Sequence, residues 1–154
     1  MAEAPHIMIV EARFYEDIAD ELVRGAVKVL EEEAATYERH AVPGVFEIPA
    51  AIQMAIRSLD FTTLRRRFDG YLALGCVIRG ETSHYDLVSE QSARALQDLA
   101  IQYTLALGFG IVTANNKEQA WARASADQRN KGGEAARTCL GMIDAKRKML
   151  LYPR

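Results

Sequence analysis

The stretch that decides the fold is Asp69-Gly-Tyr-Leu-Ala-Leu-Gly-Cys-Val-Ile-Arg-Gly-Glu-Thr-Ser-His-Tyr-Asp86. Its apolar part, residues 71–78, has the length and composition of a buried strand. A turn follows at Gly80 and a helical pattern begins at His84, so a strand end, a helix N-terminus and an imidazole are close together in sequence. Ligands of α/β proteins bind at the carboxyl ends of parallel strands, and helix N-termini attract anions. We therefore expect the functional site around this stretch.

Strand-like and helix-like segments alternate along the rest of the chain. Compact apolar or alternating runs predict further strands at residues 6–10, 36–42 and 108–114. Apolar residues at helical spacing predict helices at residues 16–30, 49–56, 84–107, 115–123 and 135–143. This alternation predicts an α/β protein, a three-layer α/β/α sandwich with a central, mainly four-stranded parallel sheet. No repeat or linker divides residues 1–154, so we expect a single domain.

Three local signals predict where helices begin or end. Ser83 and Asp86 have the spacing of a capping box, so Ser83 is the expected N-cap of a helix of about six turns. Pro49 is acceptable only in the first turn of its helix. Asn130-Lys-Gly-Gly133 is expected to break the helix that precedes it.

The composition argues against several classes of protein. Hydrophobic residues make up 49% of the 154-residue chain, which argues against disorder and for a substantial core. The formal net charge of -2 gives no electrostatic reason to expect binding to nucleic acid or to an anionic membrane. No apolar run approaches the ~20 residues that span a membrane.

The N-terminal residues and the cysteines indicate the cellular compartment in which to expect the protein. Residues 1–5 lack a signal-peptide pattern. Cys76 and Cys139 are far apart and lie in apolar surroundings, so we expect two reduced, buried thiols in a cytoplasmic protein. No cluster of His, Cys and carboxylate residues has metal-ligand spacing, so no bound metal is expected.

His84 is the strongest candidate for chemistry. It follows a strand-end turn, where a pocket is expected, and histidine is the most usable acid or base near neutral pH. The alternative is a surface imidazole or a helix-capping group. His6 and His40 lie within or beside predicted strands, and nothing in the sequence converges on them.

Three cations and two aromatic residues lie near predicted turns. Arg79, Arg123 and Lys131 could each bind a phosphate or carboxylate, although each one alone is more typical of a surface charge. Phe14 and Phe109 could stack on a flat heterocycle, although core packing is the commoner role of such residues.

Glu47 lies in a turn between Pro43-Gly44 and Pro49. Its carboxylate would either hydrogen-bond hydroxyl groups of a ligand or stabilise the next helix N-terminus.

Taken together, and without any comparison to a family, these candidate residues predict an α/β binding or catalytic domain for a small, anionic ligand.

Six short motifs go further, because they occur together in one order and spacing. They resemble those of the lumazine synthase family, and the resemblance runs from about residue 6 to residue 148. Any one motif would be weak evidence, whereas six in register are specific. The motifs are Arg13-Phe14, Pro43-Gly-Val-Phe-Glu-Ile-Pro49, Gly75-Cys-Val-Ile-Arg-Gly-Glu-Thr-Ser-His-Tyr-Asp86, Gly110-Ile-Val-Thr113, Glu118-Gln-Ala120 and Asn130-Lys-Gly132.

The resemblance implies a flavodoxin-like fold and a transferase of riboflavin biosynthesis that needs no cofactor. In that reaction, 5-amino-6-(D-ribitylamino)uracil condenses with 3,4-dihydroxy-2-butanone 4-phosphate. Imine formation, phosphate elimination and ring closure give 6,7-dimethyl-8-ribityllumazine, phosphate and water, in the penultimate step of the pathway. Such chemistry needs proton transfers, a phosphate clamp and a platform for a flat ring.

The resemblance also implies a role for each matching residue. His84 resembles the general acid/base of the family, and Phe14 resembles the aromatic residue that stacks on the pyrimidine. The other residues implied within one subunit are the ribityl-binding turn Val45, Phe46 and Glu47, the pyrimidine-reading strand end Cys76, Val77 and Ile78, and the phosphate loop Glu81 and Thr82.

A neighbouring subunit is expected to complete the site. It would contribute Phe109, Arg123 on the phosphate, and Lys131 assisted by Glu134, so that His84, Arg123 and Lys131 are the expected catalytic residues. The family forms pentamers, and some members assemble pentamers into a hollow shell; the sequence leaves both forms open. Riboflavin synthase is a further expected partner.

Two positions depart from the pattern of the family. Tyr15 changes the surroundings of Phe14, and Glu81 is an acid where many members have a small residue, so we expect phosphate contact there through the backbone.

A catalytically weak flavin- or lumazine-binding paralogue is the main alternative function, but it would not need the phosphate clamp. A flavodoxin-like regulatory domain would need an acidic pocket, which Glu11 alone does not make.

Overall fold

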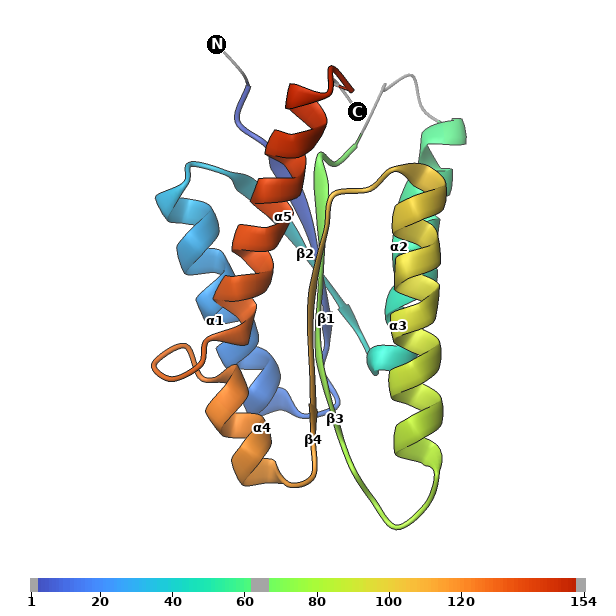
Figure 1. Ribbon diagram of the computed structural model, residues 1–154, viewed down its shortest axis with the longest axis vertical. Helices are drawn as coiled ribbons and strands as arrows, with labels where there is room; N and C mark the ends of the chain where they lie inside the picture. Colours follow the sequence, from blue (N-terminus) through green and yellow to red (C-terminus); the bar gives the residue numbers. More distant parts are fainter. Residues whose placement is uncertain (1–2, 62–66, 152–154) are drawn as a thin grey trace.

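A four-stranded parallel sheet forms the middle layer of the protein, and helices cover both of its faces (Figure 1). The computed structural model describes residues 3–61 and 67–151. The strands, in the spatial order β2-β1-β3-β4, are β1 (His6–Ala12), β2 (Thr36–Val42), β3 (Gly70–Ile78) and β4 (Leu107–Ala114). One face carries α1 (Glu16–Glu32), α4 (Lys117–Ala124) and α5 (Lys131–Lys148); the other carries α2 (Ile48–Arg57) and α3 (His84–Tyr103). The predicted three-layer α/β/α sandwich is confirmed.

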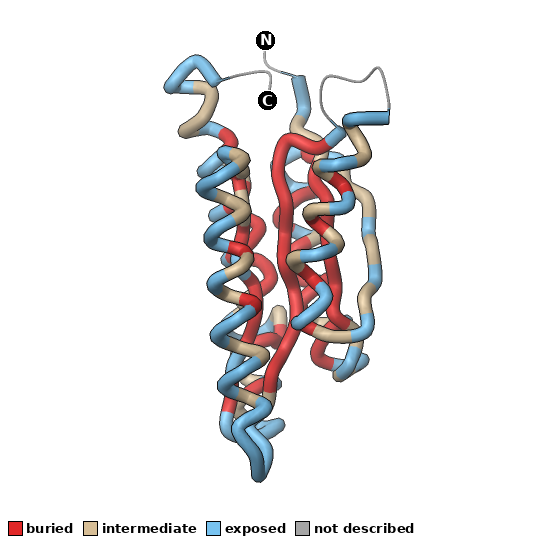
Figure 2. The backbone as a smooth tube through the Cα atoms, turned by 90° about the vertical axis from the view of Figure 1, so that its right-hand side faces the viewer, coloured by how far each residue is buried: buried red, intermediate tan, exposed pale blue. Residues whose placement is uncertain are grey.

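Burial across the sheet follows from the position of each strand. β3 is central, and residues 70–77 are all buried, as expected for a strand covered on both faces. β2 is an edge strand without a single fully buried residue. Figure 2 shows the contrast between the buried central strands and the helices, which expose one side. The apolar run at residues 71–78 therefore identifies the centre of the sheet.

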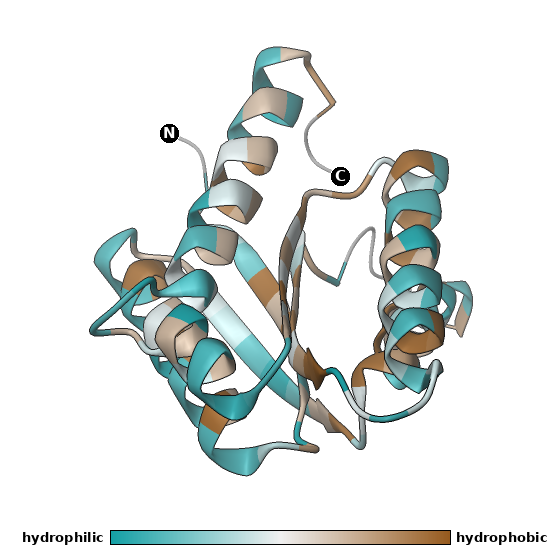
Figure 3. Cartoon of the chain, turned by 60° about the horizontal axis from the view of Figure 1, so that its bottom comes forward, coloured by the Kyte–Doolittle hydropathy of each residue, from teal (hydrophilic) through white to brown (hydrophobic). Residues whose placement is uncertain are grey.

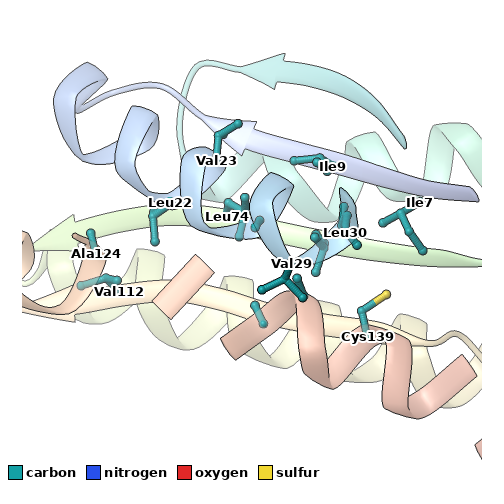
Figure 4. Packing of buried hydrophobic residues seen from close by; sticks show 14 of the residues in the cluster. Ile7, Ile9, Leu22, Val23, Val29, Leu30, Leu74, Val112, Ala124 and Cys139 are labelled. Atoms are coloured by element: carbon teal, nitrogen blue, oxygen red, sulfur yellow. The ribbon is translucent and has the colours of Figure 1, made fainter. Parts of the chain in front are cut away.

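The larger core lies between the sheet and the helices α1, α4 and α5 (Figure 4). Ile7 and Ile9 of β1 share this core with Leu22 and Leu30 of α1, and all four are fully buried. Cys139 of α5 is also completely buried there. Burying one such aliphatic side chain contributes roughly 1.5–3 kcal/mol, so the spacing that predicted α1 also attaches it to the sheet.

A second, smaller core attaches α2 and α3 to the opposite face of the sheet. Val10 of β1 and Ala73 of β3 share it with Ile48 and Ile52 of α2 and with Leu96 of α3. The side chains of β1 and β3 thus point alternately into the two cores, as the two-residue period of a strand requires. Both helix layers are fixed to these two strands, whose carboxyl ends line the candidate site.

Close packing between α1 and α5 predicts opposite effects for two glycine substitutions in one helix. A Cβ at Gly132 would lie 2.0 Å from the backbone oxygen of Leu22, whereas a Cβ at Gly141 meets nothing within 4 Å. We expect Gly132→Ala to lower the free energy of unfolding by about 1–3 kcal/mol or more, the cost of overpacking a core. Gly141→Ala should raise it by roughly 0.5–1 kcal/mol, because alanine is the better helix former. Urea denaturation measures both, and equal effects would show that α1 and α5 do not pack this closely.

Two expected helix boundaries are wrong. The helix predicted for residues 84–107 ends at Tyr103, because Thr104 adopts a left-handed conformation (φ 56°) and its N–H bonds back to Ala100; Leu107 already belongs to β4. The segment at residues 130–133 does not break a helix but begins α5. The Asn130 side chain accepts a hydrogen bond from the Gly133 N–H at 3.1 Å, which satisfies a backbone donor of the first turn. Other predicted features hold: Pro49 lies in the first turn of α2, and Ser83 is the N-cap of α3, although its side chain makes no capping bond.

Candidate active site

The main cavity lies where the strand order of the sheet reverses. The chain runs from β1 through α1 to β2 on one side, while β3 lies on the other side of β1. Ligands of open α/β sheets bind outside the strand ends at this point. A cavity of about 550 Å³ opens there, formed by the segments after β1 and β2, the end of β3 and the start of α3. Figure 3 brings these strand ends forward and shows hydrophobic residues at their tips.

Most of the residues expected within one subunit line this single cavity. They are Phe14, Val45, Phe46, Glu47, Cys76, Val77, Ile78 and His84. The cavity also contains residues that the sequence analysis did not assign to the site, namely Tyr15, Pro43, Gly44, Leu87 and Val88. The sequence could have identified Leu87 and Val88 by helical spacing, because they follow His84 by three and four residues and so share its helix face.

An exposed aromatic ring borders the cavity. Phe14 is 74% exposed, although phenylalanine usually lies inside a protein. Its backbone is held by the preceding residue, since the Arg13 N–H donates to the Val42 oxygen at 3.0 Å. The Tyr15 ring meets the Phe14 ring edge-on, with centroids 4.9 Å apart. The face of Phe14 is therefore available to stack on a flat heterocycle.

A buried ion-pair network supports the segment that carries Phe14. Glu11, at the end of β1, is 3% exposed and receives hydrogen bonds from Arg13 and Arg39, each at 2.8 Å. Arg13 also pairs with Glu16 and Asp20 of α1. Burial raises the pKa of Glu11, but the hydrogen bonds from Arg39 and Arg13 outweigh it, so the net pKa is lowered and the carboxylate stays ionised. Glu11 is thus a structural anion, which counts against an acidic pocket of the regulatory type.

His84 lies at the mouth of the cavity, on the first residue of α3. The residue is exposed, and its backbone N–H donates to the Thr82 hydroxyl at 3.3 Å. Arg79 fixes the start of this helix, since its guanidinium lies 4.3 Å from the centre of the Tyr85 ring and donates to the Asn115 side chain at 3.2 Å. The backbone that carries the imidazole is therefore held in place, and the exposed residue has access to water, as a group that exchanges protons requires.

The turn after β2 packs tightly against the end of β3. Val45 is 4% exposed, and a Cβ at Gly75 would lie only 2.7 Å from the Val45 side chain. The short helix η1 (Val45–Glu47) can approach β3 because Gly75 has no side chain. This contact brings Phe46 and Glu47 beside Cys76–Ile78, so an apolar wall and a carboxylate face the same cavity.

Cys76 lines the cavity as a neutral thiol. Burial raises its pKa, and that of Cys139, to about 12 in each case. We expect neither thiol to react appreciably with iodoacetamide at pH 8 in the native protein, because only about 10⁻⁴ of a thiol with this pKa is ionised there. Both should react in urea. Mass spectrometry of the labelled protein measures this, and rapid native labelling of Cys76 would show that its environment is polar.

The remaining predicted residues lie outside this cavity. Glu81 and Thr82 are exposed in the loop before α3 and do not line it. Phe109 borders a separate apolar groove between α3 and α5, with a volume of about 510 Å³. Arg123, Lys131 and Glu134 border a third pocket of about 240 Å³ beside the end of β4. One chain therefore brings together the residues expected for the ring and the ribityl chain, but not the cations expected for the phosphate.

The third pocket contains a cation that the sequence analysis missed. Arg129 lines it together with Arg123 and Lys131. The Lys131 ammonium pairs with Glu134 at 3.2 Å, and Arg123 donates to the Gln119 backbone oxygen at 3.4 Å. Arg129 carried no signal in the sequence, because it lies in a polar loop between α4 and α5 without a recognisable motif.

The described part of the chain contains neither a metal-ligand cluster nor a membrane-spanning helix. Within residues 3–61 and 67–151, no three or more His, Cys, Asp or Glu residues are arranged to hold a metal ion. Over the same ranges, none of the helices has the length and apolar character needed to cross a membrane.

The sheet, the cavity at its strand-order reversal and the imidazole at the mouth are typical of α/β proteins that bind a small ligand at their strand ends. The chain belongs to the 6,7-dimethyl-8-ribityllumazine synthase family, whose model matches residues 4–147. A 6,7-dimethyl-8-ribityllumazine synthase from Agrobacterium fabrum is 54% identical over 145 residues, covering 94% of this chain and 97% of the relative. One from Bartonella tribocorum is 51% identical over 148 residues, covering 96% and 94% of the two chains. A 6,7-dimethyl-8-ribityllumazine synthase 1 from Rhizobium meliloti is 54% identical over 144 residues, with 94% and 93% covered.

Proposed function

We propose that this protein condenses 5-amino-6-(D-ribitylamino)uracil with 3,4-dihydroxy-2-butanone 4-phosphate, giving 6,7-dimethyl-8-ribityllumazine, phosphate and water. The observation that carries the proposal is one cavity that combines an exposed aromatic face, a carboxylate turn and an imidazole in a chain of this family. An exposed stacking ring, a hydroxyl-binding carboxylate and a proton-transfer group are what the two substrates require.

The pyrimidine is proposed to lie against Phe14. Its ring would stack on the exposed phenyl face, while the backbone of residues 76–78 reads its polar edge. The ribityl chain would then extend along the turn at residues 45–47, where the Glu47 carboxylate accepts hydrogen bonds from its hydroxyl groups. The amine to be condensed would point toward the cavity mouth and His84.

His84 is proposed to move the protons of the condensation. The amine attacks the ketone carbon and loses a proton as the carbonyl oxygen gains one, and water then leaves to form the imine. An exposed imidazole can accept and return these protons, and can do so again during phosphate elimination and ring closure. The phosphate would lie near the loop of Glu81 and Thr82, held by backbone N–H groups at the start of α3 while the Glu81 side chain points to solvent.

A second copy of the chain is proposed to supply the missing phosphate clamp, in a pentameric ring that is either free or part of a shell. The groove that contains Phe109 is apolar, and Ile101 and Met142 at its edges are 70% and 45% exposed. On α2 and the turn before it, Met54 and Phe46 are 69% and 58% exposed. Docking of this exposed apolar surface into the groove of a neighbour would bury both, and such unlike surfaces generate rings.

This docking would also complete the site. Phe46 belongs to both the α2 surface and the main cavity, and Phe109 belongs to the groove. A neighbour seated in this way would place its Phe109 beside the cavity, and its β4 would then direct Arg123 and Lys131 toward the phosphate. Product transfer to riboflavin synthase and a cytoplasmic location are part of the proposal, and the two unpaired thiols agree with a reducing compartment.

A steady-state assay with both substrates tests the function. We expect lumazine, followed by its absorbance, and inorganic phosphate to appear at equal rates that are proportional to the enzyme concentration. Tight binding of lumazine or riboflavin without turnover would instead identify a carrier paralogue. Such a paralogue would have no use for His84 and the cation pocket, and no feature of the cavity favours it.

A further inference from the structure

We infer that Arg129 is a second phosphate-binding guanidinium, acting with Arg123 in the pocket beside β4. This inference rests on the proposed function and extends it to a residue outside the motifs of the sequence. The juxtaposition is direct: Arg123 from α4, Arg129 from the loop and Lys131 from α5 line one small pocket with Thr113 of β4.

The charge of this pocket suits a dianion. It contains three cationic side chains and one carboxylate, and that carboxylate, Glu134, is already paired with Lys131 at 3.2 Å. Among the residues that the structure describes, neither Arg123 nor Arg129 forms an ion pair with a carboxylate, although most of the described arginines do. Two guanidinium groups without carboxylate partners in one pocket are the arrangement that binds a phosphate through paired N–H donors.

The loop that carries Arg129 is anchored at several points. The Arg129 N–H donates to the Ala122 oxygen at 3.1 Å, and the Asn130 N–H donates to the Ser125 oxygen at 2.9 Å. The loop is also tied to α1, where Arg24 pairs with Asp127 at 3.1 Å. Asn130 completes the turn in a left-handed conformation with φ 51°. The backbone at residue 129 is therefore fixed, and only its side chain needs to order when an anion binds.

This position predicts a selective kinetic effect. Arg129 contacts the proposed phosphate and no part of the cavity that holds the pyrimidine. Its removal should weaken binding of the phosphorylated substrate, in the Michaelis complex and the transition state alike, and leave the proton transfers at His84 unchanged. A change in KM at constant kcat is the signature of such uniform binding.

The test compares Arg129→Gln, Arg129→Lys and Lys28→Gln. Lys28→Gln removes a positive charge from an exposed site on α1, away from all three pockets, and serves as the matched control. We expect Arg129→Gln to raise KM for the butanone phosphate and Ki for inorganic phosphate by about 10-fold, the effect of losing one charge-assisted contact of about 1.4 kcal/mol. Its kcat and its KM for the pyrimidine should match wild type. The KM for the butanone phosphate and the Ki for phosphate of Arg129→Lys should lie between those of wild type and Arg129→Gln, since lysine keeps the charge but lacks the planar guanidinium fork.

Two results would overturn the inference. One is an unchanged KM and Ki in Arg129→Gln, and the other is an equal rise of KM for both substrates, as a general loss of structure would give. Calorimetric titration of wild type and Arg129→Gln with inorganic phosphate separates this inference from the proposed function. Wild-type protein that makes no lumazine would disprove the function, whereas an active protein whose phosphate affinity does not depend on Arg129 would disprove only the inference.

Discussion

His84→Ala is expected to lower kcat by roughly 10- to 10⁴-fold, which is the range that a positioned acid or base contributes. The imidazole lies at the mouth of the main cavity on the first residue of α3, and it is the only histidine among the residues described that lines that cavity. Removing it leaves water to carry the protons of imine formation and phosphate elimination. Binding of both substrates should change little, because the proposed ring platform at Phe14 and the proposed ribityl-binding turn at Glu47 are untouched.

Rapid-mixing kinetics under saturating conditions measure this effect, since they separate chemistry from product release. His40→Ala is the matched control, because His40 lies in the middle of β2, away from the cavity, and bonds to Glu38 at 3.3 Å. It should keep wild-type kcat. An equal loss in both variants, or no loss in His84→Ala, would remove His84 from the proposed role.

Mixing two inactive variants should restore activity, and this is the second large effect. If each site combines the cavity of one chain with the cation pocket of its neighbour, His84→Ala subunits still offer Arg123, and Arg123→Ala subunits still offer His84. In a ring with one kind of unlike interface and equal, random mixing, about a quarter of the sites then have both residues intact. Activity should therefore rise from near zero to about 25% of wild type.

The control mixture combines His84→Ala with Phe14→Ala. Both residues lie in the same cavity, so every site keeps one defect and no restoration is expected. Native mass spectrometry of size-tagged subunits verifies mixing and reports the number of subunits in the ring. Restoration in both mixtures, or in neither despite verified mixing, would contradict a site shared between subunits.

The local pattern of the sequence was sufficient for the layers and for His84, whereas the family resemblance supplied most of the other residues of the main cavity. An apolar run at residues 71–78 predicted the central strand, because a parallel strand covered on both faces must be apolar on both. His84 was found because strand ends and helix starts meet at one edge of such a sheet. These signals are local: each depends on residues that are neighbours in the chain or on one helix face.

Two elements differ from the prediction where local signals compete. Leu107 continues the apolar stripe of α3 but belongs to β4, because the left-handed turn at Thr104 ends the helix and pairing with Tyr71 stabilises the strand. Gly132 has a low helix propensity but lies inside α5, where its missing side chain allows contact with Leu22 of α1. In both cases a contact between distant segments outweighs the local preference.

By itself, the sequence determined the order of strands and helices and the imidazole that follows the central strand, because periodicity and turn residues encode them locally. Only the tertiary structure decided that Phe109 and the cations lie outside that cavity, and that Arg129 joins Arg123 and Lys131 in one pocket. The physical reason is that a pocket is formed by segments far apart in the chain. The packing of α4, the 125–130 loop and α5 against β4, rather than any spacing in the sequence, brings these three charges together.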